Sequence, residues 1–516
     1  MNRQVSLFLV LTAALLMANQ SLADIWYVDG AAPPGGSGTS WASAFKTIQQ
    51  AVDASSGGDE IWVKKGNYVL SAQILVDLQV ALYGGFAGTE TSRTQRNPTT
   101  NVTTIDGNNS VRCLYVTANN VVVDGFTITK GVTTGSDRGG GLFNTVSGSG
   151  TNTTVANCKF LNNHCPGNSG GGIYDEQGHM TISGCTFQGN TANNRGGAIY
   201  VYYSSSTSFG TAEITDCDFA QNTAGSGGAL FFKGGTGSGP NEILGCTFTG
   251  NRTESPSGSS DGGAIVCDPT TTITGCTFVG NTATRYGTIA TFGDTGNTIT
   301  VTSSAFVNNE AEFGGGICVN GTSGYLGSLI ITNCTFSGNV ASGGGGAIYN
   351  LKSLGVSSQF VVTNSILWND SDDEIAVGGS GGLPTVRYSD VDQDGYAGSN
   401  GNIRQTPLFV SASNLHLTGT SPCIDVGTNS APSIPLQDID GEDRTMDGDE
   451  NGSSIVDMGA DEFNPGSTPP GWTAATVPPT GDPRVRIRQS ATVNALAMLL
   501  LPFGAIVAAA AFRRRR

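Results

Sequence analysis

The chain has 516 residues, of which 75 are glycine and only 13% are charged, and its formal net charge is −16. This glycine-rich, weakly charged composition is typical of β proteins with many turns and excludes a disordered acidic chain. A surface this acidic repels nucleic acid and anionic membranes, so we expect no nucleic-acid partner.

Residues 1–23 have the pattern of an export signal. Arg3 is followed by an apolar run at residues 5–17, and Ser21-Leu22-Ala23 has the small-x-small form of a cleavage site. The apolar run is too short to span a bilayer as a helix. We therefore expect an exported protein at the cell surface, in the outer membrane or, after processing of its C-terminal tail, outside the cell.

Residues 24–125 are predicted to cap and begin a β solenoid. Residues 25–28 have the pattern of a strand, and residues 41–54 have apolar side chains at helical spacing. A short amphipathic helix there would cover the open end of the first coil, as solenoids require. Residues 88–100 are predicted to form a polar loop that leaves the stack.

Residues 126–385 repeat the phrase Cys-x-Phe-x-x-Asn every 27 to 32 residues, and a second phrase, Gly-Gly-Ala-Ile, falls between the copies. A period near 30 residues marks a solenoid. Each repeat has room for short strands but not for a helix of ordinary length. We therefore predict an all-β fold, a single-stranded right-handed parallel β-helix like that of pectate lyases, with a short N-terminal capping helix and a C-terminal apolar anchor helix.

Equivalent residues of successive coils are expected to stack in columns. The phenylalanine column is predicted to lie inside, where each ring contributes roughly 1.5–3 kcal/mol of burial. The asparagine column is predicted at an inward bend, where the amides bond one another and the turn backbone. Residues that every coil needs have structural roles rather than catalytic ones. These residues are Phe160, Phe187, Phe219, Phe248, Phe278, Phe306, Phe336, Asn163, Asn190, Asn222, Asn251, Asn281, Asn309 and Asn339.

The cysteines at the first position of the repeat are predicted to be small buried side chains. Their Cβ vectors would run parallel in neighbouring coils, which suits the torsion of a disulfide poorly.

Residues 386–464 are predicted to form an Asp-rich module that closes the last coil. Asp447-x-Asp449-x-Asn451-Gly452 has the layout of a calcium loop, and Asp457 lies next to its twelfth position. One hypothesis is calcium held by Asp447, Asp449, Asn451 and Asp457. The alternative is a set of turns in which these side chains bond their own backbone. Calcium is the only cofactor that the sequence suggests.

Residues 465–490 form a linker rich in Pro, Gly and Thr, and residues 491–516 end the chain. The apolar run at 491–512 is long enough to span a bilayer, and the arginines that follow it favour the inner side. We predict a transmembrane or sorting tail that contacts the membrane through residues 491–512. The partners implied are the export machinery and a C-terminal sorting machinery.

Several quoted segments resemble known families. WYVDG, SWASAFKTIQQAV, GDEIWVKKGNYV and YGGFAGTETSRTQRN resemble exported bacterial right-handed β-helix proteins of the parallel-β-helix-repeat type. The Phe-x-x-Asn and Gly-Gly-Ala-Ile phrases are similar to the repeats of chlamydial polymorphic outer membrane proteins. The acidic segment resembles the choice-of-anchor tails of bacterial surface β-helices. The resemblance implies a surface or secreted protein, in the chlamydial case an adhesin, and supplies no catalytic residues.

The sequence favours a non-enzymatic structural or adhesive display module tethered by its C-terminus. Its expected partner is a surface polysaccharide or a ligand on a host or neighbouring cell. One alternative is a polysaccharide lyase or glycoside hydrolase acting on acidic polysaccharide, and another is a calcium-dependent surface adhesin. Such enzymes need carboxylates with calcium and a base, or two carboxylates at a defined separation.

No charged cluster of that kind interrupts the central repeats, and His164, His179 and His416 are scattered along the chain. We therefore assign no catalytic residue. Tyr202, Tyr203 and Tyr286 are expected to be exposed, where they could stack on sugars.

Overall fold

The structure is a computed structural model, and it describes only part of the chain. The predicted export signal before residue 23, nearly all of the linker and the apolar run at 491–512 lie outside the described residues. No helix in the described part is both long and apolar enough to cross a membrane. The described residues are 23–145, 152–176, 179–203, 211–234, 240–254, 261–291, 297–320, 328–351, 359–379 and 381–466.

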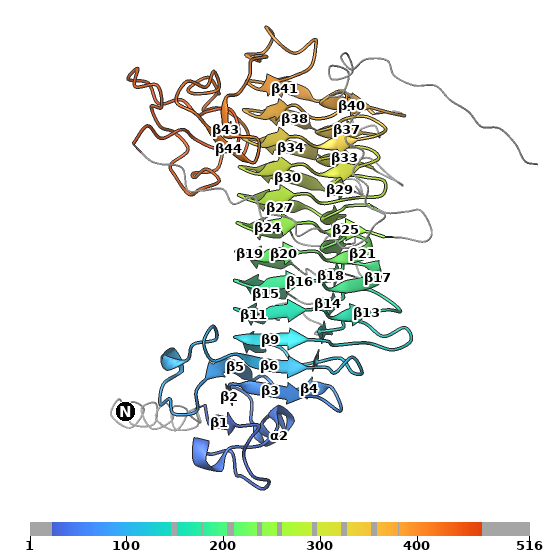
Figure 1. Cartoon of the computed structure of the whole chain (residues 1–516), viewed down its shortest axis with the longest axis vertical. Coiled ribbons are helices and arrows are strands. Elements are labelled where there is room, and N and C mark those ends of the chain that lie inside the picture. Colours follow the sequence, from blue (N-terminus) through green and yellow to red (C-terminus); the bar gives the residue numbers. More distant parts are fainter. Residues whose placement is uncertain are drawn as a thin grey trace, which may run out of the picture. The chain divides into compact units, whose positions relative to one another are not determined.

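Parallel strands of successive coils stack into three long sheets, which in the described residues contain 13, 12 and 11 strands (Figure 1). The 13-strand sheet contains β1 (Ile25–Val28), β2 (Glu60–Lys64), β5 (Ala81–Phe86), β8 (Val122–Asp124), β11 (Asn152–Ala156), β15 (His179–Ser183), β19 (Ala212–Thr215), β23 (Asn241–Leu244), β27 (Thr271–Thr274), β30 (Thr298–Thr302), β34 (Ser328–Thr332), β38 (Phe360–Thr363) and β41 (Thr385–Arg387). The 12-strand sheet contains β3 (Gly66–Val69), β6 (Thr103–Asp106), β9 (Phe126–Thr129), β12 (Lys159–Leu161), β16 (Thr186–Gln188), β20 (Asp218–Ala220), β24 (Thr247–Thr249), β28 (Thr277–Val279), β31 (Ala305–Val307), β35 (Thr335–Ser337), β39 (Ile366–Trp368) and β42 (Asp390–Val391).

The 11-strand sheet contains β4 (Ile74–Val76), β7 (Leu114–Val116), β10 (Leu142–Asn144), β14 (Ile173–Glu176), β18 (Ile199–Tyr202), β22 (Leu230–Lys233), β26 (Ile265–Cys267), β29 (Ile289–Thr291), β33 (Ile317–Val319), β37 (Ile348–Asn350) and β40 (Ile375–Val377). Two shorter sheets lie at the turns of the coils: the four-strand sheet of β13 (His164–Cys165), β17 (Thr191–Arg195), β21 (Thr223–Ser226) and β25 (Arg252–Thr253), and the pair β32 (Glu310–Ala311) and β36 (Val340–Ala341). After the last coil, β43 (Phe409–Ser411) and β44 (Asn414–Leu417) form an antiparallel pair.

The phenylalanine column lies inside the coils. From Phe160 to Phe336, each phenylalanine pairs in register with the phenylalanine of the next coil. Neighbouring rings are stacked with centroids 4.5 to 5.0 Å apart and interplanar angles of 5 to 7°. Each of these side chains is at most 1% exposed. The predicted all-β parallel β-helix is confirmed.

The asparagine column forms a continuous hydrogen-bonded ladder. Asn163 donates from its backbone N and from Nδ2 to Oδ1 of Asn190, at 3.1 and 3.0 Å. Asn190 Nδ2 also donates to the carbonyl O of Phe160 at 2.8 Å, so the ladder ties side chains to the backbone of the preceding coil. The same arrangement continues to Asn339, and every member is fully buried.

The eleven cysteines are all among the described residues, and each is buried with a free thiol. Those of the repeat form a third internal column. Cys158 N donates to Cys185 Sγ at 3.4 Å, and Cys185 Sγ donates to the carbonyl O of Val155 at 3.6 Å. The thiols therefore act as small buried side chains that also satisfy backbone groups.

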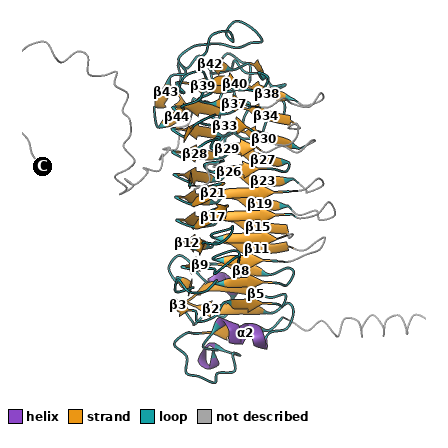
Figure 2. Ribbon diagram, turned by 90° about the vertical axis from the view of Figure 1, so that its right-hand side faces the viewer, coloured by secondary structure: helices purple, strands orange, loops and turns teal. Residues whose placement is uncertain are grey.

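The N-terminal cap is shorter than the sequence predicts. Instead of one helix over residues 41–54, a 3₁₀ turn, η1 (Trp41–Ser43), is followed by α2 (Ile48–Ala54), which lies at the N-terminal end of the stack (Figure 2). The helix begins late because Phe45 pairs with Val28 as a β-bridge, and because Thr47 caps α2 in a capping box with Gln50. The buried residues of α2 still join the main core.

The polar loop at residues 88–100 contains a 3₁₀ turn, η2 (Arg93–Gln95), and returns to the stack. Arg96 Nη2 binds Asp124 Oδ2 at 2.5 Å, and Asn97 N donates to the carbonyl O of Gly85 at 2.8 Å. This loop covers the side of the first coils and contributes to one of the grooves described below.

Most of the C-terminal module does not close the last coil, contrary to the prediction. Strands β41 and β42 continue the coils, but later residues lie along the side of the β-helix (Figure 1), where β43 and β44 pack against β28 and β31. Thr332 Oγ1 donates to the carbonyl O of Pro432 at 2.7 Å, and Ala460 N donates to Thr335 Oγ1 at 2.9 Å.

The outward side chains of the 12-strand sheet explain why the C-terminal module packs against the later coils. Early coils carry exposed charged residues there, such as Lys159 and Asp218, whereas later coils carry Val307, Thr335 and Ile366. These three are at most 1% exposed, because the module packs over them. The change from charged to uncharged outward positions marks where the module packs.

Candidate functional site

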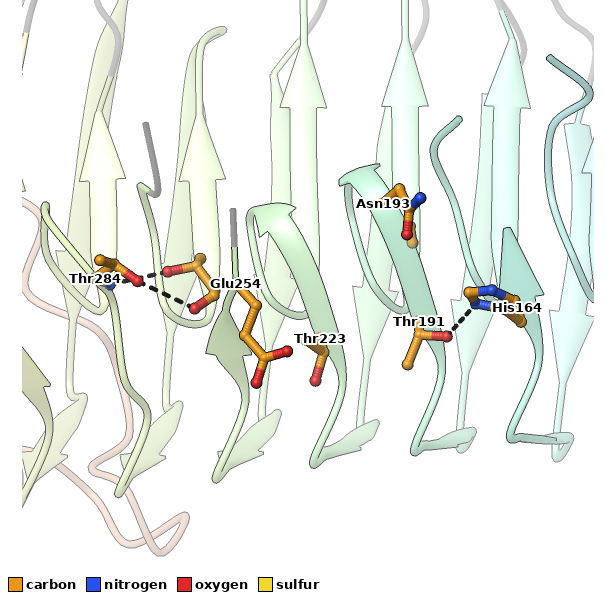
Figure 3. Close-up of a pocket in the computed structure, with 8 residues that line it drawn as sticks. His164, Thr191, Asn193, Thr223, Glu254 and Thr284 are labelled. Carbon is orange, nitrogen blue, oxygen red and sulfur yellow. Dashed lines mark hydrogen bonds between the residues drawn. The ribbon is translucent and has the colours of Figure 1, made fainter. Parts of the chain in front are cut away.

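A polar groove of about 640 Å³ follows the four-strand sheet across several coils (Figure 3). The register aligns outward residues of successive strands: His164 pairs with Thr191, and Thr191 pairs with Thr223. The residues that follow His164 and Thr191 in these strands, Cys165 and Ala192, are buried. The groove is lined by His164, Thr191, Ala192, Asn193, Thr223, Thr253, Glu254 and Thr284.

Hydrogen bonds between neighbouring coils orient the side chains of this groove. His164 Nδ1 and Thr191 Oγ1 are 2.5 Å apart, and Thr284 Oγ1 donates to the carbonyl O of Thr253 at 3.2 Å (Figure 3). Parallel strands lie about 4.8 Å apart, so the outward groups recur at that spacing. The groove therefore presents a regular row of hydroxyl, imidazole and amide groups.

The ionisable groups of the polar groove are far apart. His164 lies on β13 and Glu254 directly follows β25, so three strand spacings, about 14 Å, separate them. Glu254 is exposed and pairs with Arg252 Nε at 2.8 Å. Two carboxyl groups about 5 to 9.5 Å apart perform glycoside hydrolysis. Among the described residues, Glu254 is the only carboxylate that lines this groove, so the described part of the groove has no such pair.

A second, basic groove of about 550 Å³ lies between the loop at 88–100 and strands β12 and β16. Arg93 pairs with Glu60 and lies over the ring of Tyr83, and Arg96 pairs with Asp124. Lys159 is exposed, and among the described residues no acidic group lies within 4.0 Å of its Nζ. This groove combines two neutralised arginines with one unpaired lysine.

The Asp-rich segment brings together only part of the predicted calcium set. Asp447 and Asp449 lie close to Asp425, and single carboxylate oxygens of the three are within 4.8 Å of one another. Asn451 Nδ2 donates to Asp449 Oδ2 at 2.8 Å. Asp457 faces elsewhere, because its two oxygens accept hydrogen bonds from Asp425 N and Phe463 N, both at 2.7 Å.

Arg444 is the buried centre of the C-terminal module, and the sequence pattern did not single it out. The residue is 1% exposed, and its Nη2 donates to Ser303 Oγ and to the carbonyl O of Ala460, both at 2.6 Å. Burial raises the pKa of Asp457 and of Asp461 to about 7 and that of Glu462 to about 9. This cluster fastens the module to the β-helix, and none of its residues lines either of the two grooves described above.

The remaining candidates have structural positions. His416 is buried, with Nε2 against Asp440 and Nδ1 against Asn414. The expectation of exposed tyrosines is wrong for two of the three, because Tyr203 is 2% exposed and Tyr286 is 7% exposed. Both rings are covered, so neither can stack on a sugar.

Comparison with known proteins supports the handedness of the fold. Residues 144–367 match the family model described as "Right handed beta helix region". Together with the parallel strand order, this match defines the described coils as a right-handed parallel β-helix. No curated protein matches the chain.

Three solved structures resemble the chain at low identity. A structure titled "Crystal structure of pectate lyase Pel9A" has a TM-score of 0.41 and 15% identity, covering 87% of this chain and 98% of that one. A rhamnogalacturonan lyase has a TM-score of 0.32 and 14% identity, covering 75% and 91%. The catalytic unit of a GH87 alpha-1,3-glucanase from Streptomyces thermodiastaticus strain HF3-3 has a TM-score of 0.28 and 15% identity, covering 71% and 70%. We draw no functional argument from these likenesses.

Proposed function

We propose that the protein is a non-enzymatic display module that binds an extended, uncharged polysaccharide in the polar groove. The observation that carries this proposal is the row of outward groups on His164, Thr191 and Thr223, which recurs at the strand spacing. A repeating polymer that lies along the row can form the same hydrogen bond with each coil. Many weak, regular contacts suit adhesion, because affinity then rises with the length of polymer engaged.

The charge of the groove favours an uncharged ligand. Among the described residues that line it, the only acidic group is Glu254, which is paired with Arg252, and the other polar side chains carry hydroxyl, amide and imidazole groups. Binding without cleavage follows from the separation of Glu254 from His164, because acid and base catalysis needs both groups within hydrogen-bond reach of one substrate bond.

We further propose that this module is exported and held at the cell surface through residues 491–512, or released by processing of that tail. The support is the sequence pattern of residues 1–23 and 491–516 and the resemblance of the repeats to bacterial surface β-helices and chlamydial adhesins. Surface fractionation of cells and detection of the intact or shortened chain test this location.

A binding titration tests the ligand proposal. The full chain is titrated with neutral and acidic polysaccharides, and the double variant T191V/T223V is compared with the control T247V. Valine keeps the shape of threonine but removes the hydroxyl, so we expect the affinity for a neutral polymer to fall about tenfold or more in the double variant. Thr247 lies on β24 outside both grooves, so the control should bind normally. Equal affinities of the double variant and the control would refute the proposal.

A lyase or hydrolase acting on acidic polysaccharide is the second candidate, and the basic groove favours it. Lys159 is exposed beside Arg93 and Arg96, which is a charge pattern suited to a polyanion. The test is turnover of pectin, alginate and glycosaminoglycan panels by the full chain. Product formation that K159M abolishes would establish this function, and absence of product from a folded protein would exclude it for those substrates.

A further inference from the structure

We infer that Asp425, Asp447 and Asp449 form a calcium site that ties two loops of the C-terminal module together. Asp425 lies in the turn that follows Cys423, and Asp447 and Asp449 begin the loop that ends at Gly452. One oxygen from each carboxylate lies within 4.8 Å of the other two. Asp449 N donates to Asp425 Oδ2 at 2.7 Å and holds the two loops in this arrangement.

Asp425 supplies the observation that separates this cluster from an ordinary group of surface acids. The residue is 8% exposed, and its Oδ1 is buried without a hydrogen-bond partner. A buried polar atom left without a partner costs roughly 1–3 kcal/mol, so native structures rarely keep one. A bound cation would satisfy this oxygen.

The three carboxylates also lack a counter-charge from the protein. Among the described residues, no lysine, arginine or histidine nitrogen lies within 4.0 Å of an oxygen of Asp425, Asp447 or Asp449. Arg444, the buried cation of the module, instead faces Glu462, with Nη1 3.6 Å from its Oε2.

Calcium is the cation that this donor set fits. Ca²⁺ takes six to eight oxygen ligands with flexible geometry, from carboxylates, carbonyls and water. Asp447 accepts one hydrogen bond at each oxygen, from Asn451 N and Gly452 N, and each oxygen keeps a further lone pair for a metal. Asp449 is exposed and Asp447 partly so, which leaves room for water ligands on the outer side.

The inferred set differs from the set that the sequence suggests. Asp425 lies outside the loop motif, at a point brought next to it by folding, and it takes the place of Asp457, which is not part of the group of converging carboxylate oxygens. The inference does not depend on the proposed polysaccharide ligand, because the cluster lies in a different part of the molecule from the polar groove.

The test is calorimetric titration of the chelator-treated full chain with CaCl₂, together with thermal unfolding. We expect one Ca²⁺ to bind per chain and to raise the Tm, and we expect MgCl₂ to act more weakly. D425N should lower the affinity by about tenfold or more, because it removes a charged ligand. The control is D394N, at an exposed aspartate that pairs with Arg404 outside the cluster, and this variant should bind Ca²⁺ normally.

D447N separates a loss of Ca²⁺ binding from a loss of folding, because Asp447 is on the solvent side of the cluster. We expect this variant to bind Ca²⁺ more weakly and to keep the circular dichroism spectrum of the wild type. Absence of Ca²⁺ binding at millimolar concentration, equal binding by D425N and D394N, or a stronger response to Mg²⁺ would overturn the inference.

Discussion

Asn339 donates two hydrogen bonds to a single oxygen of Asp370, from its backbone N at 2.6 Å and from Nδ2 at 2.8 Å. In every earlier coil of the ladder an asparagine accepts this pair of bonds. An asparagine such as Asn190 donates from its backbone N and from Nδ2 to the acceptor of the next coil, and its Nδ2 also donates to the carbonyl O of Phe160 in the preceding coil. The Asp370 carboxylate terminates the ladder at its C-terminal end with a group that only accepts.

Asp370 is therefore expected to stabilise the last coils. D370A leaves two buried donors of Asn339 without their acceptor, and we expect a loss of about 2–4 kcal/mol in the free energy of unfolding. D370N keeps an acceptor oxygen at the same position and should cost clearly less. Urea unfolding of the two variants measures the difference, and equal losses would contradict the role assigned to Asp370.

Stability is expected to fall as the pH rises above about 5. Burial raises the pKa of Glu374 to about 10 and that of Asp370 to about 6, and burial also raises the pKa of Glu462 to about 9. A group with a raised folded-state pKa binds more protons in the folded than in the unfolded chain between its two pKa values. The contribution of such a group to the free energy of unfolding is complete below its pKa in the unfolded chain, which is near 4.5 for glutamate. This contribution is lost as the pH rises to the pKa of the group in the folded chain.

Thermal unfolding between pH 4.5 and 10 checks this dependence. E374Q holds the position neutral at every pH, so the decline in Tm with rising pH should be shallower in this variant. E310Q, which changes an exposed glutamate of β32, should keep the wild-type slope. Parallel curves for wild type and E374Q would show that Glu374 ionises normally.

Because of the phenylalanine column, we expect alanine substitutions at two adjacent residues of β24 to differ greatly in their effect on the free energy of unfolding. Phe248 is fully buried, with the rings of Phe219 and Phe278 each 4.8 Å away, so F248A should cost about 3–5 kcal/mol through cavity formation. Thr247 is half-buried on the outer face, and T247A should cost little. Chemical unfolding of both variants provides the comparison, and small, equal effects would mean that the register is wrong.

Arg444 is predicted to hold the C-terminal module against the side of the β-helix. R444M removes the bonds to Ser303 and to the carbonyl O of Ala460 and leaves the buried Glu462 without a cation, so we expect a loss of about 3–5 kcal/mol. Hydrogen exchange should then increase over residues 404–466 and over the outer face of β31 and β35. R404M, at an exposed ion pair, is the control and should leave exchange unchanged.

The coils could be predicted from the sequence because their determinants are local and periodic. Phe248 and Asn251 recur at one spacing in each repeat, and a residue that every coil repeats has one position in the fold. Contacts between distant segments could not be predicted in this way. Arg444 binds Ser303 across 141 residues of sequence, and no repeat relates these positions.

Two further differences between the sequence-based prediction and the structure also arise from contacts between separate segments of the chain. The helix expected at residues 41–54 begins late because the backbone of Phe45 pairs with β1, which the helical spacing of the segment cannot reveal. The calcium-loop pattern identified Asp447 and Asp449 but not Asp425, which folding brings to them from another turn. Among the residues that line the polar groove, the sequence pattern marked only His164 as a candidate. Single threonines in short strands form no pattern that distinguishes them from other threonines.

Hydrogen exchange of the full chain with and without a bound neutral polysaccharide tests the central claim most directly. The account predicts slower exchange at the backbone of β13, β17, β21 and β25, which line the polar groove, and unchanged exchange at residues 93–99 and 157–159 of the basic groove. Protection confined to the basic groove, or shortening of the polysaccharide during the experiment, would contradict the account.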